Sequence, residues 1–406
     1  MDFSYSEEQE AVRELADRIF DDLATHERLR AMEQQPGDRF DADLWSELAA
    51  AGLVGIAVPE RLGGGGLGFV AAALVCEAAG RTAAYVPAVE TVATGAPAIA
   101  EFGTAAQHDA WLPGIVAGET VVTAALAEVG GVPMGWPDGD EAGATAAGAA
   151  ASGSGASGVG ASRLAGVPSV TASPTGDGWT VSGHVSFVRW GMQADVLLVP
   201  AQVVGGGIGV FIVPSGASGV ERVAQLANTG QIEAAVTLAD VGLGADGLLG
   251  PVDEVGTVAM SLVRRATAGI CMLQAGAVRS AVRLMAEYTK TREQFGKAIA
   301  TFQAVGQRAA DAYVDAEAVR LTAWQAAWRI DAGLPADEAV AVAKYWAAEG
   351  GQRVVHAAVH LHGGVGVDRD YPLHRHFLAT KYNELTLGGA TEQLRRLGAA
   401  LAEAPD

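Results

Sequence analysis

Histidines cluster in the C-terminal third of the chain, where they could bind a metal ion. Five of the eight lie between His356 and His376. His356 and His360 are four residues apart, and on a helix this spacing would place both imidazoles on one face, as in helical zinc sites. No glutamate follows His356 as it does in zinc proteases, and no third ligand is apparent. We therefore predict no metal site and interpret these histidines as polar residues around a turn at Gly363 and Gly364.

A second chemical pattern is a glycine-rich stretch in the first quarter of the chain. Gly63, Gly65 and Gly68 match G-x-G-x-x-G, the fingerprint of a dinucleotide-binding turn. That fold needs a strand leading directly into the turn, and Pro59 interrupts the approach within a region of helical periodicity. We interpret this stretch as a flexible surface turn.

Three further segments carry more specific information. They read Thr291-Arg292-Glu293-Gln294-Phe295-Gly296-Lys297, His360-Leu361-His362-Gly363-Gly364-Val365-Gly366 and Leu387-Gly388-Gly389-Ala390-Thr391-Glu392. At this separation they resemble the C-terminal domain of the acyl-CoA dehydrogenase family, and the order of Gly52-Leu53, Pro59-Glu60 and Leu112-Pro113 resembles its N-terminal domain. The resemblance covers nearly the whole chain except about residues 132–166. It implies an FAD-dependent oxidoreductase that acts on acyl-CoA thioesters.

In this family, one subunit contributes side chains to the FAD that its neighbour binds. The resemblance assigns this contact to Arg292, Phe295 and Gln303: arginine offers a rigid donor fork to pyrophosphate oxygens, and phenylalanine offers an apolar wall. Gly363 and Gly364 fit a close approach of the backbone to the cofactor, because glycine has no side chain. His360 is a further expected contact, at a position where the family usually has glutamine.

The same resemblance places Gly388 where the family has its catalytic glutamate. The alternative family position for this base, on the helix around Arg265 and Ala266, has no carboxylate either. Glu384, one helical turn before Gly388, is a candidate substitute base, although most such glutamates are solvated or paired. General-base catalysis is worth about 10²- to 10⁴-fold, so this loss is serious for a dehydrogenase.

Two other segments that a subunit supplies to its own flavin are also altered. The family's Trp-x-Thr strand reads Phe187-Val188-Arg189 here, which replaces a short hydroxyl by a long cation. The segment 127–133 lacks the threonine, proline and serine of the family pattern. The segments supplied to the neighbour's flavin are largely kept. The losses are therefore one-sided.

We predict that the chain is the catalytically degenerate partner in a heteromeric acyl-CoA dehydrogenase, such as a heterotetramer of lipid or steroid catabolism. FAD would be shared with a paralogous subunit, an acyl-CoA would be the substrate and electron-transfer flavoprotein the acceptor. Two alternatives stay open. One is a homotetrameric flavoenzyme with a non-standard base or different flavin chemistry, and the other is a non-catalytic acyl-CoA-binding or scaffold protein.

The elements that must position these segments fall into three regions. Residues 1–120 have helical periodicity, residues 121–250 contain alternating and short apolar runs, and residues 251–406 are helical again. We predict an α+β fold with an N-terminal helical domain, a central small β-domain and a C-terminal helical bundle. A seam of apolar residues at heptad spacing should pack in the bundle: Phe302, Val305, Ala309, Ala312, Ala316, Val319 and Ala323. A Gly/Ala/Ser-rich insertion at 139–166 is predicted to be a mobile loop.

Composition excludes several other classes of protein. The formal net charge of -20 argues against nucleic acid and anionic membrane surfaces as partners. The two cysteines, Cys76 and Cys271, provide neither a disulfide framework nor a metal cluster, which favours a reducing cytoplasm. The N-terminal segment has no apolar signal-peptide core, and no apolar run reaches membrane-spanning length.

Overall fold

The computed structural model describes residues 5–35, 37–130 and 166–403. Helices, then a sheet, then helices follow one another along the chain, which confirms the predicted α+β fold. The Gly/Ala/Ser-rich segment predicted at 139–166 lies outside the described residues except for its last position. Within the described part of the chain, none of the helices is both long enough and apolar enough to cross a membrane.

The N-terminal region is helical up to Val116. Ser6 and Gln9 form a reciprocal capping box at the start of its first helix, which satisfies amides that the helix itself leaves unpaired. Its elements are α1 (Glu7–Leu23), α2 (His26–Gln34), α3 (Ala42–Ala50), η1 (Glu60–Leu62), α4 (Gly68–Thr82), the π-helical segment η2 (Ala88–Gly95), α5 (Ala96–Phe102) and α6 (Ala105–Val116).

The glycine-rich stretch before α4 is a turn, as predicted. Gly63 and Gly68 have φ angles of 87° and 75°, in the left-handed region that favours glycine. No strand leads into this turn, since η1 and turns precede it among the described residues. The carboxylate of Asp331 accepts hydrogen bonds from the backbone N–H groups of Phe69 and Val70. The start of α4 is therefore occupied by a side chain of the protein itself rather than prepared for a phosphate.

The central region is one mixed sheet with the strand order β6-β7-β3-β2-β4-β5-β8, and β1 pairs with β4 in parallel. The alternating run that predicted a strand from Trp179 to Phe187 is part of β3, where a register shift follows Val181. The elements are β1 (Val122–Ala124), α7 (Ala127–Gly130), β2 (Thr171–Thr175), β3 (Gly178–Val188), β4 (Val196–Val203), β5 (Ile208–Pro214), β6 (Val220–Leu226), β7 (Ile232–Gly244), η3 (Ala245–Gly247) and β8 (Leu248–Asp253).

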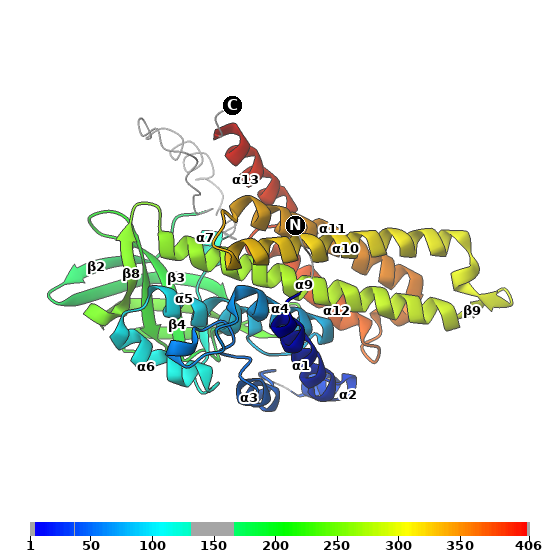
Figure 1. The fold of residues 1–406 in the computed structure, drawn as a ribbon, viewed down its shortest axis with the longest axis horizontal. Coiled ribbons are helices and arrows are strands. Elements are labelled where there is room, and N and C mark those ends of the chain that lie inside the picture. The colour runs from blue at the N-terminus through cyan, green and yellow to red at the C-terminus, as the bar shows by residue number, and fades with distance from the viewer. Residues whose placement is uncertain (1–4, 36, 131–165, 404–406) are drawn as a thin grey trace.

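The C-terminal region is a bundle of long helices. Figure 1 shows that α9 and α10 extend past the other helices as a hairpin whose tip, marked by β9, lies at the opposite end of the molecule from the sheet. The elements are α9 (Thr257–Thr291), β9 (Glu293–Gln294), β10 (Lys297–Ala298), η4 (Ile299–Thr301), α10 (Gln303–Asp331), α11 (Asp337–His362), η5 (Gly363–Val367), α12 (Leu373–Leu385) and α13 (Ala390–Glu403).

The predicted heptad seam on α10 is buried over only part of its length. Ala312, Ala316, Val319 and Ala323 are buried, which confirms the packing of the C-terminal part of the seam. Phe302, Val305 and Ala309 are only half-buried, because the start of α10 belongs to the projecting hairpin. The prediction was wrong for Phe302 and Val305 as core residues, whereas the half-buried Ala309 packs against the core.

Two glycines let α4 and α9 approach closely and so bring the N-terminal region against the bundle. A Cβ atom on Gly80 would lie 1.8 Å from the carbonyl oxygen of Leu273, and one on Gly276 would lie 2.0 Å from that of Glu77. Neither position can hold a larger residue without separating the helices. This contact forms the floor of the pocket described next.

Candidate functional site

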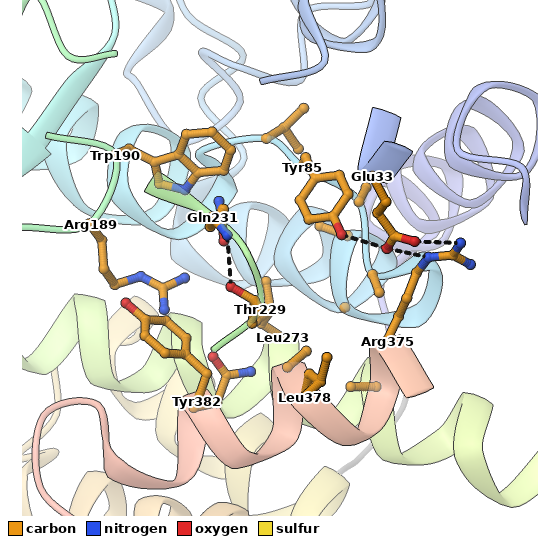
Figure 2. A pocket seen from close by; sticks show the side chains of 18 residues that line it. Glu33, Tyr85, Arg189, Trp190, Thr229, Gln231, Leu273, Arg375, Leu378 and Tyr382 are labelled. Carbon is orange, nitrogen blue, oxygen red and sulfur yellow. Dashed lines mark hydrogen bonds and ion pairs between the residues drawn. The ribbon is translucent and has the colours of Figure 1, made fainter. Parts of the chain in front are cut away.

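A pocket that is open to solvent lies between α4, the end of β3, the β6–β7 turn, α9 and α12. Its floor consists of small or apolar residues of α4, α9 and α12, among them Ala79, Leu273 and Leu378. Figure 2 shows Arg189 and Tyr382 together on one side of the pocket, and Glu33, Tyr85 and Arg375 together on another. Charged residues from segments distant in sequence therefore meet on both sides of an apolar floor.

Arg189 crosses from the sheet to the helical bundle. Its guanidinium forms an ion pair with Glu90 of η2, and its Cζ atom lies 4.8 Å from the centroid of the Tyr382 ring on α12. The side chains are largely buried, with 15% of Arg189 and 6% of Glu90 exposed. Arg189 follows directly on β3, at the position where the family resemblance expects a short hydroxyl at the flavin edge. In this chain the position holds a guanidinium that contacts Glu90 and Tyr382.

Removal of Glu90 should lower the free energy of unfolding, because it leaves a buried cation unpaired. Glu90→Ala leaves the Arg189 guanidinium without its carboxylate, and breaking a buried ion pair in this way typically costs about 3–5 kcal/mol. We expect chemical denaturation to show this loss in the free energy of unfolding. The double variant Glu90→Ala with Arg189→Met should recover much of the loss, because it removes the unpaired charge. An equal loss of stability in the single and the double variant would contradict the buried ion pair between Arg189 and Glu90.

Glu233 on β7 is a second buried carboxyl beside Arg189. Only 3% of the residue is exposed, and its Oε2 atom has no hydrogen-bond partner among the described residues. Burial raises the pKa of this carboxyl to about 7, although the nearby Arg189 guanidinium favours the ionised form. A protonated, neutral Glu233 at mildly acidic pH is consistent with both observations.

This raised pKa predicts a pH dependence of stability. Between the ordinary glutamate pKa and about pH 7, the folded state holds a proton that the unfolded state has released. The contribution of Glu233 is therefore complete at pH 4 and is lost as the pH rises towards 7. Glu233→Gln should leave stability near pH 4 almost unchanged and raise it at pH 8, as measured by urea unfolding. The exposed Glu221→Gln is the control, and the same pH profile in both variants would exclude the assignment.

The turn at Gly388 is a buried backbone structure whose left-handed φ favours glycine. The carbonyl oxygen of Gly388 accepts hydrogen bonds from Lys344 Nζ at 2.9 Å and from Gln393 Nε2 at 3.2 Å. The residue has a φ of 95°, and a Cβ atom there would lie 2.9 Å from Gln393 Nε2 and 3.0 Å from Glu392 Cγ. The position expected to carry the family's base is therefore occupied by a glycine that the local structure requires.

Lys344 was not among the predicted site residues, yet its ammonium group binds the backbone of this turn. Its Nζ atom also donates to the carbonyl oxygen of Glu384 at 3.0 Å, and the residue is fully buried. Burial lowers the pKa of Lys344 to about 8. The spacing of Val340, Lys344 and Ala347 along one face of α11 was the available signal, because a lysine at an apolar position of a helix needs buried acceptors.

The candidate substitute base Glu384 is engaged elsewhere. Its carboxylate lies 2.5 Å from Lys381 Nζ, one turn away on α12. The neighbouring residues Tyr382 and Asn383 line the pocket. At the alternative family position, Arg265 forms an ion pair with Glu101, and Ala266 is buried. A role of Glu384 as a base stays a prediction, and the ion pair favours a structural role.

The other charged group on the pocket was also missed in the sequence. Arg375 donates two hydrogen bonds to the Glu33 carboxylate, at 2.6 and 3.0 Å. The Tyr85 hydroxyl donates a third hydrogen bond to the same carboxylate at 2.8 Å. Burial alone would raise the pKa of Glu33, but the nearby His374 imidazole, 3.6 Å away, and the hydrogen bonds from Arg375 outweigh it and hold the pKa at about 2. Since these residues are hundreds of positions apart in sequence, spacing gave no signal for the pair.

The six residues predicted to contact a cofactor lie on the surface. Arg292, Phe295 and Gln303 are exposed on the α9–α10 hairpin, with 91% of Phe295 accessible to solvent. His360, Gly363 and Gly364 are exposed at the end of α11, and a Cβ atom on either glycine would meet nothing within 4 Å. Figure 1 shows the hairpin tip pointing away from the rest of the chain. These six residues are therefore accessible to a ligand or to another chain.

The helical regions on either side of the sheet each match a family model. Residues 6–119 match the model of the acyl-CoA dehydrogenase N-terminal domain, and residues 256–402 match that of the acyl-CoA dehydrogenase C-terminal domain. The chain belongs to the acyl-CoA dehydrogenase family.

The chain is similar to relatives from Mycobacterium tuberculosis (strain ATCC 25618 / H37Rv). It is 38% identical to acyl-CoA dehydrogenase FadE27, over 100% of both chains, and 31% identical to acyl-CoA dehydrogenase FadE28, over 87% of this chain and 91% of the relative. The crystal structure of the ChsE4-ChsE5 complex from M. tuberculosis contains a chain that is 38% identical over the full length of both, with a TM-score of 0.86. A variant of the Tcur3481-Tcur3483 steroid ACAD contains one that is 40% identical over 98% of both, with a TM-score of 0.83.

Proposed function

We propose that this chain is the catalytically degenerate subunit of a heteromeric, FAD-dependent acyl-CoA dehydrogenase, and that it completes the FAD site of a paralogous subunit. The partner would hold the acyl-CoA substrate and carry the base, and electron-transfer flavoprotein would accept the electrons. Two similar solved structures are described as a two-protein complex and a steroid ACAD, which favours lipid or steroid catabolism for this chain as well.

One observation carries the proposal. The residues that would serve the chain's own flavin are altered, whereas those that would contact a partner's flavin are kept. At its own pocket, Arg189 contacts Glu90 and Tyr382 at the position where the family has a short hydroxyl for the flavin. Gly388 provides no base, and its φ of 95° disfavours any residue with a side chain there. On the projecting hairpin, by contrast, Arg292 and Phe295 are exposed. An inactive homo-oligomer would have no use for the hairpin residues, because no subunit would bind a flavin for them to contact. In a heteromer they would contact the flavin of the partner.

The residues present fit FAD held by a partner and do not fit FAD held by this chain. Arg292 would pair with the pyrophosphate, Phe295 would lie against an apolar face of the cofactor, and Gln303 would add polar contacts. Gly363 and Gly364 would let the backbone approach the nucleotide, and the exposed His360 adjoins them. FAD, when bound, would accept a hydride from the β-carbon of the substrate. This chain's part is to orient the cofactor.

Flavin stoichiometry tests the proposal. The chain is purified alone and after co-expression with each family member of the same genome that keeps a glutamate at the position of Gly388. We expect little flavin absorbance for the chain alone and about half the homomeric amount, one FAD per two chains, for one assembled pair. Full flavin occupancy of the chain alone would favour the homotetrameric flavoenzyme. Lack of flavin with every partner would favour a non-catalytic acyl-CoA-binding protein.

A further inference from the structure

Three aromatic rings join α9, the end of α11 and the segment before α12. The imidazole of His362 stacks on the Tyr288 ring with centroids 4.4 Å apart and an interplanar angle of 24°. The Tyr371 ring lies 5.1 Å from His362 and 6.5 Å from Tyr288. His362 is 3% exposed, although it borders a surface turn. We call Tyr288, His362 and Tyr371 the aromatic stack.

Hydrogen bonds fix the state of the imidazole. His362 Nδ1 donates to the carbonyl oxygen of Ala358 at 2.7 Å, which leaves Nε2 to accept from the Tyr371 hydroxyl at 3.1 Å. Burial lowers the pKa of His362, so the neutral ring is favoured. Both ring nitrogens are thus used, and the ring can neither rotate nor move without losing a hydrogen bond and the contact with Tyr288.

The aromatic stack lies between the two segments that we assign to the partner's FAD. Tyr288 is in the last turn of α9, and its carbonyl oxygen accepts the backbone N–H of Arg292 at 2.8 Å. His362 is the last residue of α11 and directly precedes Gly363, which has a φ of 62°. A displacement of His362 would therefore move the hairpin base and the glycine turn relative to each other.

We propose that His362 is a positioning residue that fixes the Arg292 segment and the Gly363-Gly364 turn in one geometry through Tyr288 and Tyr371. It touches neither substrate nor cofactor, and acts through the segments it joins. This inference rests on the proposed function, because it concerns how this chain presents its FAD-contacting surface. Metal binding does not explain His362, since both of its nitrogens already have protein partners.

The test measures the affinity of the assembled complex for FAD, by fluorescence titration of the apo-complex, in a double-mutant cycle. We expect His362→Ala and Arg292→Ala each to weaken FAD binding about tenfold or more, and the double variant to weaken it by clearly less than the product of the two. His362→Gln, which can still accept from Tyr371, should recover part of the loss. Tyr371→Phe removes only the hydroxyl and should cause a smaller loss in the same direction.

Light scattering and melting temperature report assembly and folding independently of flavin. His356→Ala is the matched control, because His356 is an exposed histidine of the same helix that contacts Phe377 rather than the turn. Unchanged FAD affinity of His362→Ala, or strictly multiplicative effects with Arg292→Ala, would overturn the positioning role. Lack of FAD binding by the unmodified complex would instead refute the proposed function, so the two failures are distinguishable.

Discussion

The Gly388→Glu variant of this chain, purified alone, is expected to show no acyl-CoA dehydrogenase turnover. Replacement of the corresponding glutamate by glutamine in the paralogous partner is expected to lower turnover of the complex by about 10²- to 10⁴-fold, which is the typical worth of a general base. The second effect should be this large because the chain has no carboxylate at Gly388 or at Arg265 and Ala266 to replace the partner's base.

The new glutamate fails for structural reasons. A side chain at Gly388 would press on Gln393, whose amide donates to the carbonyl oxygens of Leu387 and Gly388 at 3.1 and 3.2 Å. The φ of 95° disfavours any residue with a Cβ atom. Arg189, with its partners Glu90 and Tyr382, would also remain in place of the short hydroxyl that the family has at the flavin edge.

The assay is acyl-CoA-dependent reduction of an artificial electron acceptor, by the chain alone and by the complex. A melting curve of Gly388→Glu checks that the variant is folded, and Gly388→Ala controls for the strain of adding any side chain. Robust turnover by the unmodified chain without a partner would overturn the degenerate-subunit proposal, and Glu384→Gln would then be the next variant to measure.

Local sequence patterns predicted the elements of this fold well, for a physical reason. The alternation from Trp179 to Phe187 is a property of a strand with one buried face, and β3 follows it. Heptad spacing likewise found the buried part of α10 from Ala312 onwards. It failed at Phe302 and Val305, because spacing records which residues share a face but not whether another helix of the same chain covers that face.

The site was predictable only where its residues are close in sequence. The glycine at position 388 and the hairpin residues around Arg292 lie within short family motifs. Arg189 was visible as a substitution, but its partners Glu90 and Tyr382 lie on other elements, and only the packing of η2, β3 and α12 brings them together. The buried acceptors of Lys344 were hidden for the same reason, since they are backbone carbonyls some forty residues further along the chain.

Replacement of Arg292 by alanine is expected to remove most FAD from the assembled complex while leaving the assembly intact. A charge-assisted hydrogen bond is worth about 1.5–3 kcal/mol, which corresponds to a roughly 10- to 150-fold weaker affinity. Arg292 is exposed at the end of α9, so its loss leaves no buried partner unsatisfied and should not lower the melting temperature. Flavin content per complex is read from absorbance after gel filtration.

Lys297→Ala separates the specific contact from general charge. Lys297 is an exposed cation on the same hairpin, and its Nζ atom lies 4.5 Å from the centroid of the Phe302 ring. With a net charge of -20, the chain attracts anions only through local groups, so a nonspecific effect of positive charge would appear in both variants. A loss confined to Arg292→Ala supports bidentate pairing with pyrophosphate, and Arg292→Lys should restore little of it, because an ammonium cannot form the fork. Unchanged flavin content in Arg292→Ala would show that Arg292 does not contact the cofactor. The match of the hairpin residues to the family pattern would then need another explanation.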